Sequence, residues 1–262
     1  MFLIKKVIEN LKEGRTSTLT GLRYDYKSLW NIDSITSDVA ILEKAFKMPR
    51  VVLNIVEEFL SATMCGPVKI CNTHNEKVLD FSEAPMPIPG NVLAGSIEVE
   101  HDQCAGLILV ETNTAMTQLK EEQKTRHYIC LYLHGTPCIA VRILAARISG
   151  IIQHKFKGLI SDCGYGGLQI HKLVKHGTPS EEDYPVNRTV PDLVHLGVLP
   201  SDIEKYFSKP DCTKQDLTPS ARASLESMKR WYIENQLELD VVPEIQLLIQ
   251  SMKTMERKKL TT

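Results

Sequence analysis

Acidic side chains follow two apolar runs near the middle of the chain. Glu111 directly follows the run at 107–110, and Asp162 comes two residues after the run at 158–160. In open α/β sheets, ligand and metal sites gather at the carboxyl ends of strands. Acids at such positions favour a role in chemistry over a role in packing. Glu111 and Asp162 are therefore the first candidates for a ligand or metal site.

The elements that would position these acids follow a regular order. Three short apolar runs, at 107–110, 129–133 and 158–160, are each followed by an amphipathic stretch of helical length. Continuous apolar runs that alternate with helices are typical of a parallel sheet buried on both faces. The sequence therefore predicts an α/β unit over about residues 105–177, with the two acids at one edge of its sheet.

Other reactive side chains give weaker signals. Tyr24 and Tyr26 lie on an expected helix, and most such tyrosines are surface or core aromatics. The histidines do not form a metal-binding triad, because they lack the i, i+4 spacing that puts two ligands on one helix face. The seven cysteines show no CxxC pairing. This pattern indicates reduced thiols in an intracellular protein and excludes a zinc cluster.

The composition excludes several function classes. The chain has 262 residues, of which 43% are hydrophobic and 24% charged, as in ordinary globular proteins. Its net charge of −1 does not indicate nucleic-acid binding by the whole surface, so a DNA contact needs a local basic surface. Charged residues interrupt the apolar N-terminal residues, which indicates an amphipathic helix and not a signal peptide. No apolar run is long enough to span a membrane.

The segments on either side of the α/β unit are predicted from period and capping residues. Helices are expected at 3–12, from Ser17 or Thr18 to about Trp30, at 34–47 and from Pro49 to about residue 59, followed by a hairpin at 68–81. Short helices followed by a two-stranded ribbon describe a winged helix, and a generic helical domain with a hairpin fits the periodicity equally well. The proline-rich stretch at 83–104 is expected to be a linker. Helices are expected again after residue 200.

Four segments, taken in order, carry a resemblance to a known family. They are LVETN (109–113), YLHGTPC (132–138), SDCGYG (161–166) and LGVLPSD (196–202). Together they resemble the A subunit of topoisomerase VI and its relative, the meiotic double-strand-break transesterase. The resemblance covers almost the whole chain. It implies a mixed α/β fold with a winged-helix domain over 1–82, a linker over 83–104, and a Toprim-type α/β domain with C-terminal helices over 105–262.

The resemblance also implies a chemistry and the residues that carry it. In this family a tyrosine of the winged-helix domain attacks a DNA phosphodiester and becomes joined to the 5′ end, while acids of the Toprim domain hold Mg²⁺. The match of Leu29-Trp30 to the family's residues after its tyrosine pair puts Tyr24 on the nucleophile. Glu111 and Asp162 are the implied Mg²⁺ ligands. The implied DNA-binding residues are Arg23, Arg50, His134 and Arg142.

Departures from the family pattern keep a second interpretation open. Ser161 and Cys163 stand where the family has a pair of aspartates, and a shift of one residue along a strand moves a side chain to the other face. Asp162 is thus either a weakened metal ligand or a turn residue. The first hypothesis is an active type IIB topoisomerase-like transesterase that forms meiotic double-strand breaks. The second is a catalytically impaired DNA-binding or dimerisation subunit. A third is a different Toprim protein, such as a primase or a nuclease.

The implied partners follow from the same resemblance. They are double-stranded DNA, a second copy or a paralogue in a dimer, and a B-type subunit through which ATP acts. The implied location is nuclear and chromosomal, with no membrane. Because the chain begins one helix before Tyr24, the resemblance also allows for a further segment upstream.

Overall fold

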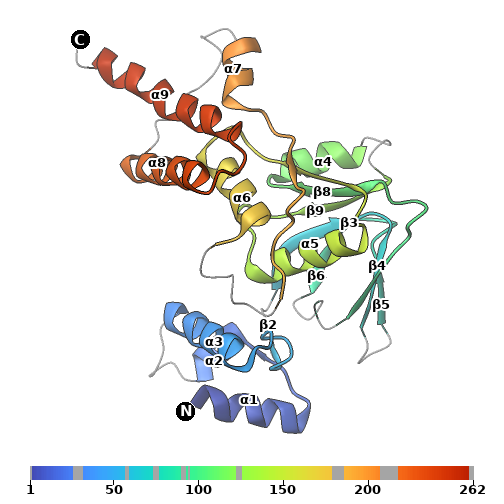
Figure 1. Cartoon of the computed structure of the whole chain (residues 1–262). Helices are drawn as coiled ribbons and strands as arrows, with labels where there is room; N and C mark the ends of the chain where they lie inside the picture. Colours follow the sequence, from blue (N-terminus) through green and yellow to red (C-terminus); the bar gives the residue numbers. More distant parts are fainter. Residues whose placement is uncertain are drawn as a thin grey trace. The chain divides into compact units, whose positions relative to one another are not determined.

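A computed structural model describes residues 2–25, 32–56, 59–72, 77–89, 93, 95–121, 126–178, 186–206 and 218–259. The chain divides into two compact units, one of residues 1–160 and 170–195 and one of residues 161–169 and 196–262. Figure 1 labels the elements along the chain. The helices are α1 (Phe2–Glu13), α2 (Leu19–Asp25), α3 (Ile32–Phe46), α4 (Asn113–Glu121), α5 (Ile139–Ile151), α6 (Tyr165–His176), α7 (Pro200–Tyr206), α8 (Pro219–Glu234) and α9 (Val241–Lys259). The strands are β1 (Ser17–Thr18), β2 (Ile55–Val56), β3 (Phe59–Cys65), β4 (Val68–Asn72), β5 (Lys77–Asp80), β6 (Met86–Pro89), β7 (Ser96–Val99), β8 (Gly106–Val110), β9 (Tyr128–Tyr132), β10 (Phe156–Ile160) and β11 (Val194–His195).

Three helices at the N-terminus pack around an apolar cluster of their own. Leu3 and Val7 of α1 and Leu22 of α2 lie in this cluster with Val39 of α3, and all four are buried. The apolar residues of α1 recur every four residues, which places them on one face of the helix. The helices predicted at 3–12 and 34–47 are confirmed. The second helix ends at Asp25 in the structure, and residues 26–31, including Tyr26 and Trp30, lie outside the described residues.

The prediction of a fourth helix that begins at Pro49 is wrong. The backbone makes one turn, in which the Val52 N–H donates to the Pro49 carbonyl, and then reaches Asn54 with a φ of 52°. A positive φ ends a right-handed helix. The two residues that follow form β2, which pairs in parallel with β1. The backbone groups here are therefore used in strand pairing, and β-branched residues suit that role.

The predicted parallel sheet is confirmed and is wider than expected. Strands β10, β8 and β9 are parallel neighbours in a six-stranded sheet of order β11-β10-β8-β9-β3-β6, in which β3 runs antiparallel to β9. Leu107 and Leu109 face a core cluster that includes residues of α5, whereas Ile108 and Val110 face a cluster that includes Met116 of α4. Figure 1 shows α5 against the sheet. Burial on both faces explains the continuous apolar run.

The hairpin predicted at 68–81 is present, but its packing does not confirm a winged helix. Strands β4 and β5 pair antiparallel, and β7 joins β4 on its other edge to make a three-stranded sheet. Val68, Ile70 and Phe81 belong to the same core cluster as Leu107 of the parallel sheet. The ribbon therefore packs on the α/β core and does not complete the N-terminal helical domain.

Two strands lie within the stretch that was expected to be a linker. β7 belongs to the three-stranded sheet, and β6 pairs with β3 at the edge of the larger sheet. Prolines at 87 and 89 fit an edge strand, because an edge strand has backbone N–H groups that need no partner. The domain boundaries at residues 82 and 104 stay predictions.

The second unit is helical, as predicted. Leu168 packs with Leu225 and Tyr232 of α8 and with Ile245 and Ile249 of α9. The predicted cap of α8 is confirmed, because the Thr218 hydroxyl accepts a hydrogen bond of 3.2 Å from the Ala221 N–H. Across the ranges that the structure describes, we find no helix with the length and hydropathy needed to cross a bilayer.

Candidate functional site

Tyr24 lies near the end of α2 and presents its side chain to solvent. The residue is 67% exposed, although Leu22 of the same short helix is fully buried. Arg23, which precedes it, is half-buried. An exposed phenol on a helix that is anchored by its neighbour is available to a large substrate such as a nucleic-acid strand. The exposure of Tyr24 also agrees with the simpler interpretation of a surface tyrosine.

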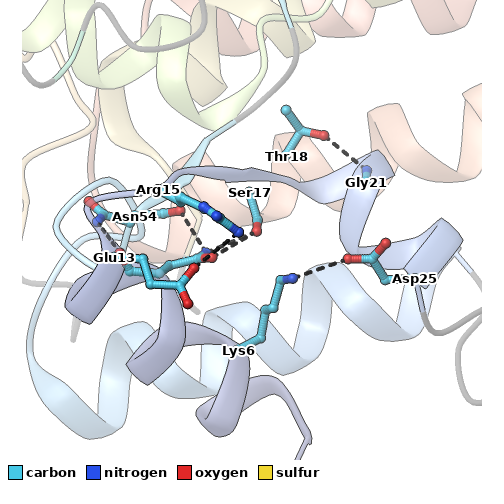
Figure 2. A network of polar contacts seen from close by, with 9 residues as sticks. Lys6, Glu13, Arg15, Ser17, Thr18, Gly21, Asp25 and Asn54 are labelled. Carbon is cyan, nitrogen blue, oxygen red and sulfur yellow. Dashed lines mark hydrogen bonds and ion pairs between the residues drawn. The ribbon is translucent and has the colours of Figure 1, made fainter.

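Polar contacts fix both ends of the helix that carries Tyr24 (Figure 2). At its start, the Thr18 hydroxyl accepts a hydrogen bond of 2.9 Å from the Gly21 N–H, which is the cap expected from the sequence. At its end, the Asp25 carboxylate lies 3.4 Å from the Lys6 ammonium of α1. The backbone on either side of Tyr24 is thus held by contacts of its neighbours.

A buried asparagine holds the strand that leads into this helix. Asn10 is 4% exposed, and its Nδ2 donates to the Ser17 Oγ at 2.9 Å and to the Asn54 carbonyl at 3.4 Å. The Asn54 Nδ2 donates back to the Asn10 carbonyl at 3.4 Å. These bonds join α1, β1 and the turn before β2 (Figure 2). The sequence analysis missed Asn10, and a buried polar position on the apolar face of an amphipathic helix was the available signal.

The carboxyl ends of β8 and β9 form the second part of the candidate site. The Glu111 N–H donates to the Ile160 carbonyl at 2.9 Å, and the Gly135 N–H donates to the Glu111 carbonyl at 3.2 Å. The Leu133 N–H donates to the Val110 carbonyl at 2.8 Å. The turn after β9 is therefore bonded directly to the backbone that carries the Glu111 carboxylate, and both stand at the edge of the sheet predicted from the sequence.

His134 projects from that turn and stacks on Tyr132. The two ring centroids are 3.8 Å apart with 29° between the planes, and His134 is exposed. Its backbone φ of 55° is unusual for a residue with a side chain, and the next residue, Gly135, has a φ of 86°. Two successive residues with positive φ turn the chain sharply after β9. The imidazole is thereby presented at the surface, where a phosphate or a base could reach it.

Asp162 comes two residues after the end of β10 and belongs to the second unit. Its side chain is exposed, whereas the neighbouring Ser161 is 6% exposed. The first turn of α6 approaches this segment closely: a Cβ at Gly167 would lie 2.3 Å from the Asp162 carbonyl and 2.7 Å from the Ser161 Oγ. Only glycine fits there, so the backbone after β10 is tightly placed. The exposed side chain of Asp162 agrees with a turn residue as well as with a ligand.

The strand ends after β8 and β10 each carry an expected Mg²⁺ ligand, Glu111 in the first unit and Asp162 in the second. Within the described ranges, no three His, Cys, Asp or Glu side chains lie close enough to hold a metal ion. Mg²⁺ takes oxygen ligands, normally one or two carboxylates together with water and phosphate oxygens. Ser161 and Cys163 offer a hydroxyl and a thiol on either side of Asp162. Glu111, in the first unit, has the carboxylate and the position at a strand end that a Mg²⁺ ligand requires.

Two of the four expected DNA-binding residues are buried. Arg50 is 5% exposed, and its guanidinium makes a two-point ion pair with the Glu43 carboxylate, from Nε at 3.2 Å and from Nη2 at 2.9 Å. Arg142 lies on α5 and is 4% exposed. In this conformation neither guanidinium is open to a phosphate, because each is enclosed by the fold. Arg23 and His134 are the expected DNA-binding residues that reach the surface.

The fold is that of an α/β protein, with Glu111 at the carboxyl end of a parallel strand. Residues 106–262, which begin at β8, match the model of the family described as Topoisomerase 6 A subunit/Spo11, Toprim domain. The chain belongs to this family, which is a topoisomerase-like DNA-cleavage family, and it is a divergent member.

Two curated relatives show how far the chain has diverged. It is 30% identical over 108 residues to the A3 subunit of DNA topoisomerase 6 from Oryza sativa subsp. indica, and this match covers 40% of the chain and 24% of the relative. It is 27% identical over 117 residues to the A subunit of DNA topoisomerase 6 from Arabidopsis thaliana, and this match covers 42% and 27%. The chain therefore spans about a quarter of the length of the curated relatives that it matches.

Proposed function

We propose that this protein forms DNA double-strand breaks in meiotic recombination by tyrosyl transesterification, with Tyr24 as the nucleophile. The observation that carries the proposal is the 67% exposure of Tyr24 on a helix fixed at both ends, in a chain of the family of Spo11 and the topoisomerase 6 A subunit. A nucleophile must be both open to the substrate and held in one direction. The exposure of Tyr24 supports the first condition, and the anchored backbone of its helix supports the second.

In the proposed reaction the Tyr24 Oη attacks the phosphorus of a DNA phosphodiester. An O–P bond forms to the 5′ side of the break, the bond to the 3′ oxygen breaks, and the phenol proton is lost as the 3′ oxygen gains one. A phenol with an ordinary pKa of about 10 is a weak nucleophile at pH 7, so the reaction depends on position and on nearby positive charge. Arg23, which precedes Tyr24 in α2, is the described cation that the sequence places closest to it.

The metal, substrate, partners and location are proposed from membership of the family. Mg²⁺ would add charge stabilisation at the phosphate, with Glu111 as the anchoring carboxylate and Asp162 as the second ligand. The substrate is double-stranded DNA, and the working unit is a dimer of two copies or of this chain and a paralogue. A B-type subunit supplies the ATP-dependent step, and the site of action is the nuclear chromosome.

The test is a comparison of two exposed tyrosines. Protein from meiotic cells is captured under denaturing conditions, and attached oligonucleotides are end-labelled. Tyr24→Phe should abolish the label and leave DNA binding within about twofold, because only the attacking oxygen is removed. Tyr206→Phe is the matched control, since Tyr206 is 65% exposed on a helix of the second unit. Equal label in the wild type and in Tyr24→Phe would refute Tyr24 as the nucleophile.

A second candidate function is a catalytically impaired DNA-binding or dimerisation subunit of the same fold. The serine and cysteine on either side of Asp162 and the burial of Arg50 and Arg142 favour it. On this alternative, Glu111→Ala leaves DNA affinity and its Mg²⁺ dependence unchanged, as does Glu83→Ala, a control at an exposed carboxylate. A Mg²⁺-dependent gain in DNA binding that Glu111→Ala removes and Glu83→Ala keeps would argue against this alternative.

A further inference from the structure

Two cysteines face each other across the junction of β3 and β9. Cys65 and Cys130 are register partners in this antiparallel pair, and their thiols share a hydrogen bond. Directly opposite residues in antiparallel strands have Cα atoms about 4.5 to 5.5 Å apart. Disulfides span Cα separations of about 4.4 to 6.8 Å, so residues in this register lie within the range that a disulfide can bridge.

The surroundings of the pair leave one thiol accessible and the other enclosed. Cys130 is 3% exposed and lies in the apolar cluster with Ile108, Val110 and Met116. Cys65 is half-buried at the end of β3 and packs against the same cluster. A dissolved oxidant can therefore reach Cys65 first, and the sulfur of Cys130 is held next to it as the resolving group.

No other cysteine pair in the described part of the chain has this arrangement. The structure describes six cysteines as free thiols, and among the paired strands only Cys65 and Cys130 are opposite one another. Cys138 and Cys104 lie outside the paired residues of β9 and β8. The inference thus concerns one defined pair, and it is independent of the proposed DNA cleavage.

We infer that Cys65 and Cys130 form a redox-active dithiol that closes to a cross-strand disulfide with a small-molecule disulfide such as oxidised glutathione. The Cys65 thiolate attacks oxidised glutathione, which forms a mixed disulfide and releases one glutathione. The Cys130 sulfur then attacks the Cys65 sulfur and releases the second glutathione. Two protein thiols are oxidised, one glutathione disulfide is reduced to two thiols, and the two thiol protons end on the released glutathiones.

The order of the two steps follows from the environment of Cys130. The contact with Cys65 and burial together raise the pKa of the Cys130 thiol. A raised pKa lowers the thiolate fraction, and the thiolate is the nucleophile. Cys65 is also the more exposed of the two, and it therefore makes the first attack. Closure also requires little movement, because opposite Cβ atoms about 4.5 to 5.5 Å apart need to approach by roughly 1 Å to reach disulfide distance.

The disulfide would join β9 to the antiparallel part of the sheet. Tyr132 ends β9 two residues after Cys130 and pairs with Thr63, two residues before Cys65. Tyr132 stacks on His134 of the turn that follows this strand. A disulfide would therefore add a covalent link across the pairing of β3 with β9, close to the exposed turn that follows β9.

The test uses the full chain in buffers of reduced and oxidised glutathione, with alkylation of free thiols and digestion by trypsin. Cys65 lies in the tryptic peptide 51–69 and Cys130 in the peptide 127–142. We expect a cross-linked peptide of these two in oxidising buffer, and two of the chain's seven cysteines become protected from alkylation. The cross-linked fraction should follow the ratio of oxidised glutathione to the square of reduced glutathione, as a two-thiol reaction requires.

Three variants assign the bond. Cys138 lies in the same peptide as Cys130, so Cys138→Ser should keep the cross-link and Cys130→Ala should remove it. If Cys130→Ala unfolds the protein, Cys65→Ser, at the more exposed cysteine of the pair, is the second test and should also remove the cross-link. Three results would overturn the inference: no cross-linked peptide in folded, oxidised wild type, glutathione adducts alone on Cys65, or a cross-link that survives Cys65→Ser.

Discussion

Replacing Arg50 separates a structural role from a DNA-binding role. The Glu43 carboxylate that Arg50 contacts is fully buried, and it accepts bonds from the Arg50 Nε, the Arg50 Nη2 and the Arg50 backbone N–H at 3.2, 2.9 and 2.9 Å. Arg50→Leu removes the first two and keeps the third. Arg188 Nη2 remains at 3.8 Å from the carboxylate, which is too far for a strong hydrogen bond. The variant therefore leaves a buried charge with much weaker compensation.

The size of the effect follows from these contacts. Breaking a buried ion pair from one side costs about 3 to 5 kcal/mol of unfolding free energy. The remaining backbone bond and the charge of Arg188 place Arg50→Leu at the lower end, at about 3 kcal/mol. Arg50→Lys keeps the charge and loses the two-point geometry, which costs about 1 to 2 kcal/mol. The double variant Glu43→Leu with Arg50→Leu should lose less than Arg50→Leu alone, because no buried charge is left.

Urea unfolding followed by far-ultraviolet circular dichroism measures these losses, and DNA affinity is measured on the folded variants in the same buffer. We expect Arg50→Leu to be destabilised, with DNA affinity within about twofold of wild type once the folded fraction is matched. Arg23→Leu, at the half-buried cation beside Tyr24, is the comparison for a true phosphate contact, with a loss of about 1 kcal/mol or more in DNA binding. A loss of DNA affinity in Arg50→Leu without loss of stability would refute the structural assignment.

Three further predictions concern packing, hydrogen bonding and pH. Gly106→Ala should lower the free energy of unfolding in urea by about 3 kcal/mol, because the added Cβ would lie 2.2 Å from a carbonyl oxygen of the neighbouring strand. Gly150→Ala, whose added Cβ would meet no atom within 4 Å, should raise it by about 0.5 to 1 kcal/mol. Equal effects of the two substitutions would contradict this. Asn10→Ala should cost about 1 to 3 kcal/mol, since it removes the buried bonds that join α1 to β1, and a loss under about 0.5 kcal/mol, the size of a surface change, would speak against the network. Hydrogen bonds from Ser82 lower the pKa of Asp80 below its ordinary value. This contribution to stability is present above pH of about 4 and is lost as pH falls through the lowered pKa. Ser82→Ala should raise the pKa of Asp80 in a carboxyl NMR titration, and an unchanged pKa would exclude the hydroxyl as the cause.

Much of the parallel core was predictable because its signals are local. A strand buried on both faces must be apolar at every position, so the runs at 107–110, 129–133 and 158–160 mark β8, β9 and β10 directly. The acid after β8 was found from the same pattern, since the end of an apolar run marks the end of a strand. The Thr218 cap of α8 and the helices α1 and α3 also depend on neighbouring residues alone.

The errors fall where partners come from far along the chain. The segment after Pro49 has the apolar spacing of a helix, but Ile55 and Val56 pair in parallel with β1 and form a strand. The ribbon of β4 and β5 was recognised, and its attachment to the α/β core was not, because the side chains of Val68 and Phe81 make that attachment with residues of distant segments. Periodicity carries no information about which surface a ribbon covers.

The sequence by itself determined the family and the parallel strands, with Glu111 at a strand end, His134 in the turn after a strand and Tyr24 on a helix. The tertiary structure alone decided which charged side chains are available for chemistry. Arg50 and Arg142 have the same local signature as surface cations, and the structure buries both, whereas Tyr24 and His134 reach the surface. The structure also brought Cys65 and Cys130 together across two strands that are distant in the chain. Exposure and pairing depend on what packs against a residue, and that is fixed only when the whole chain has folded.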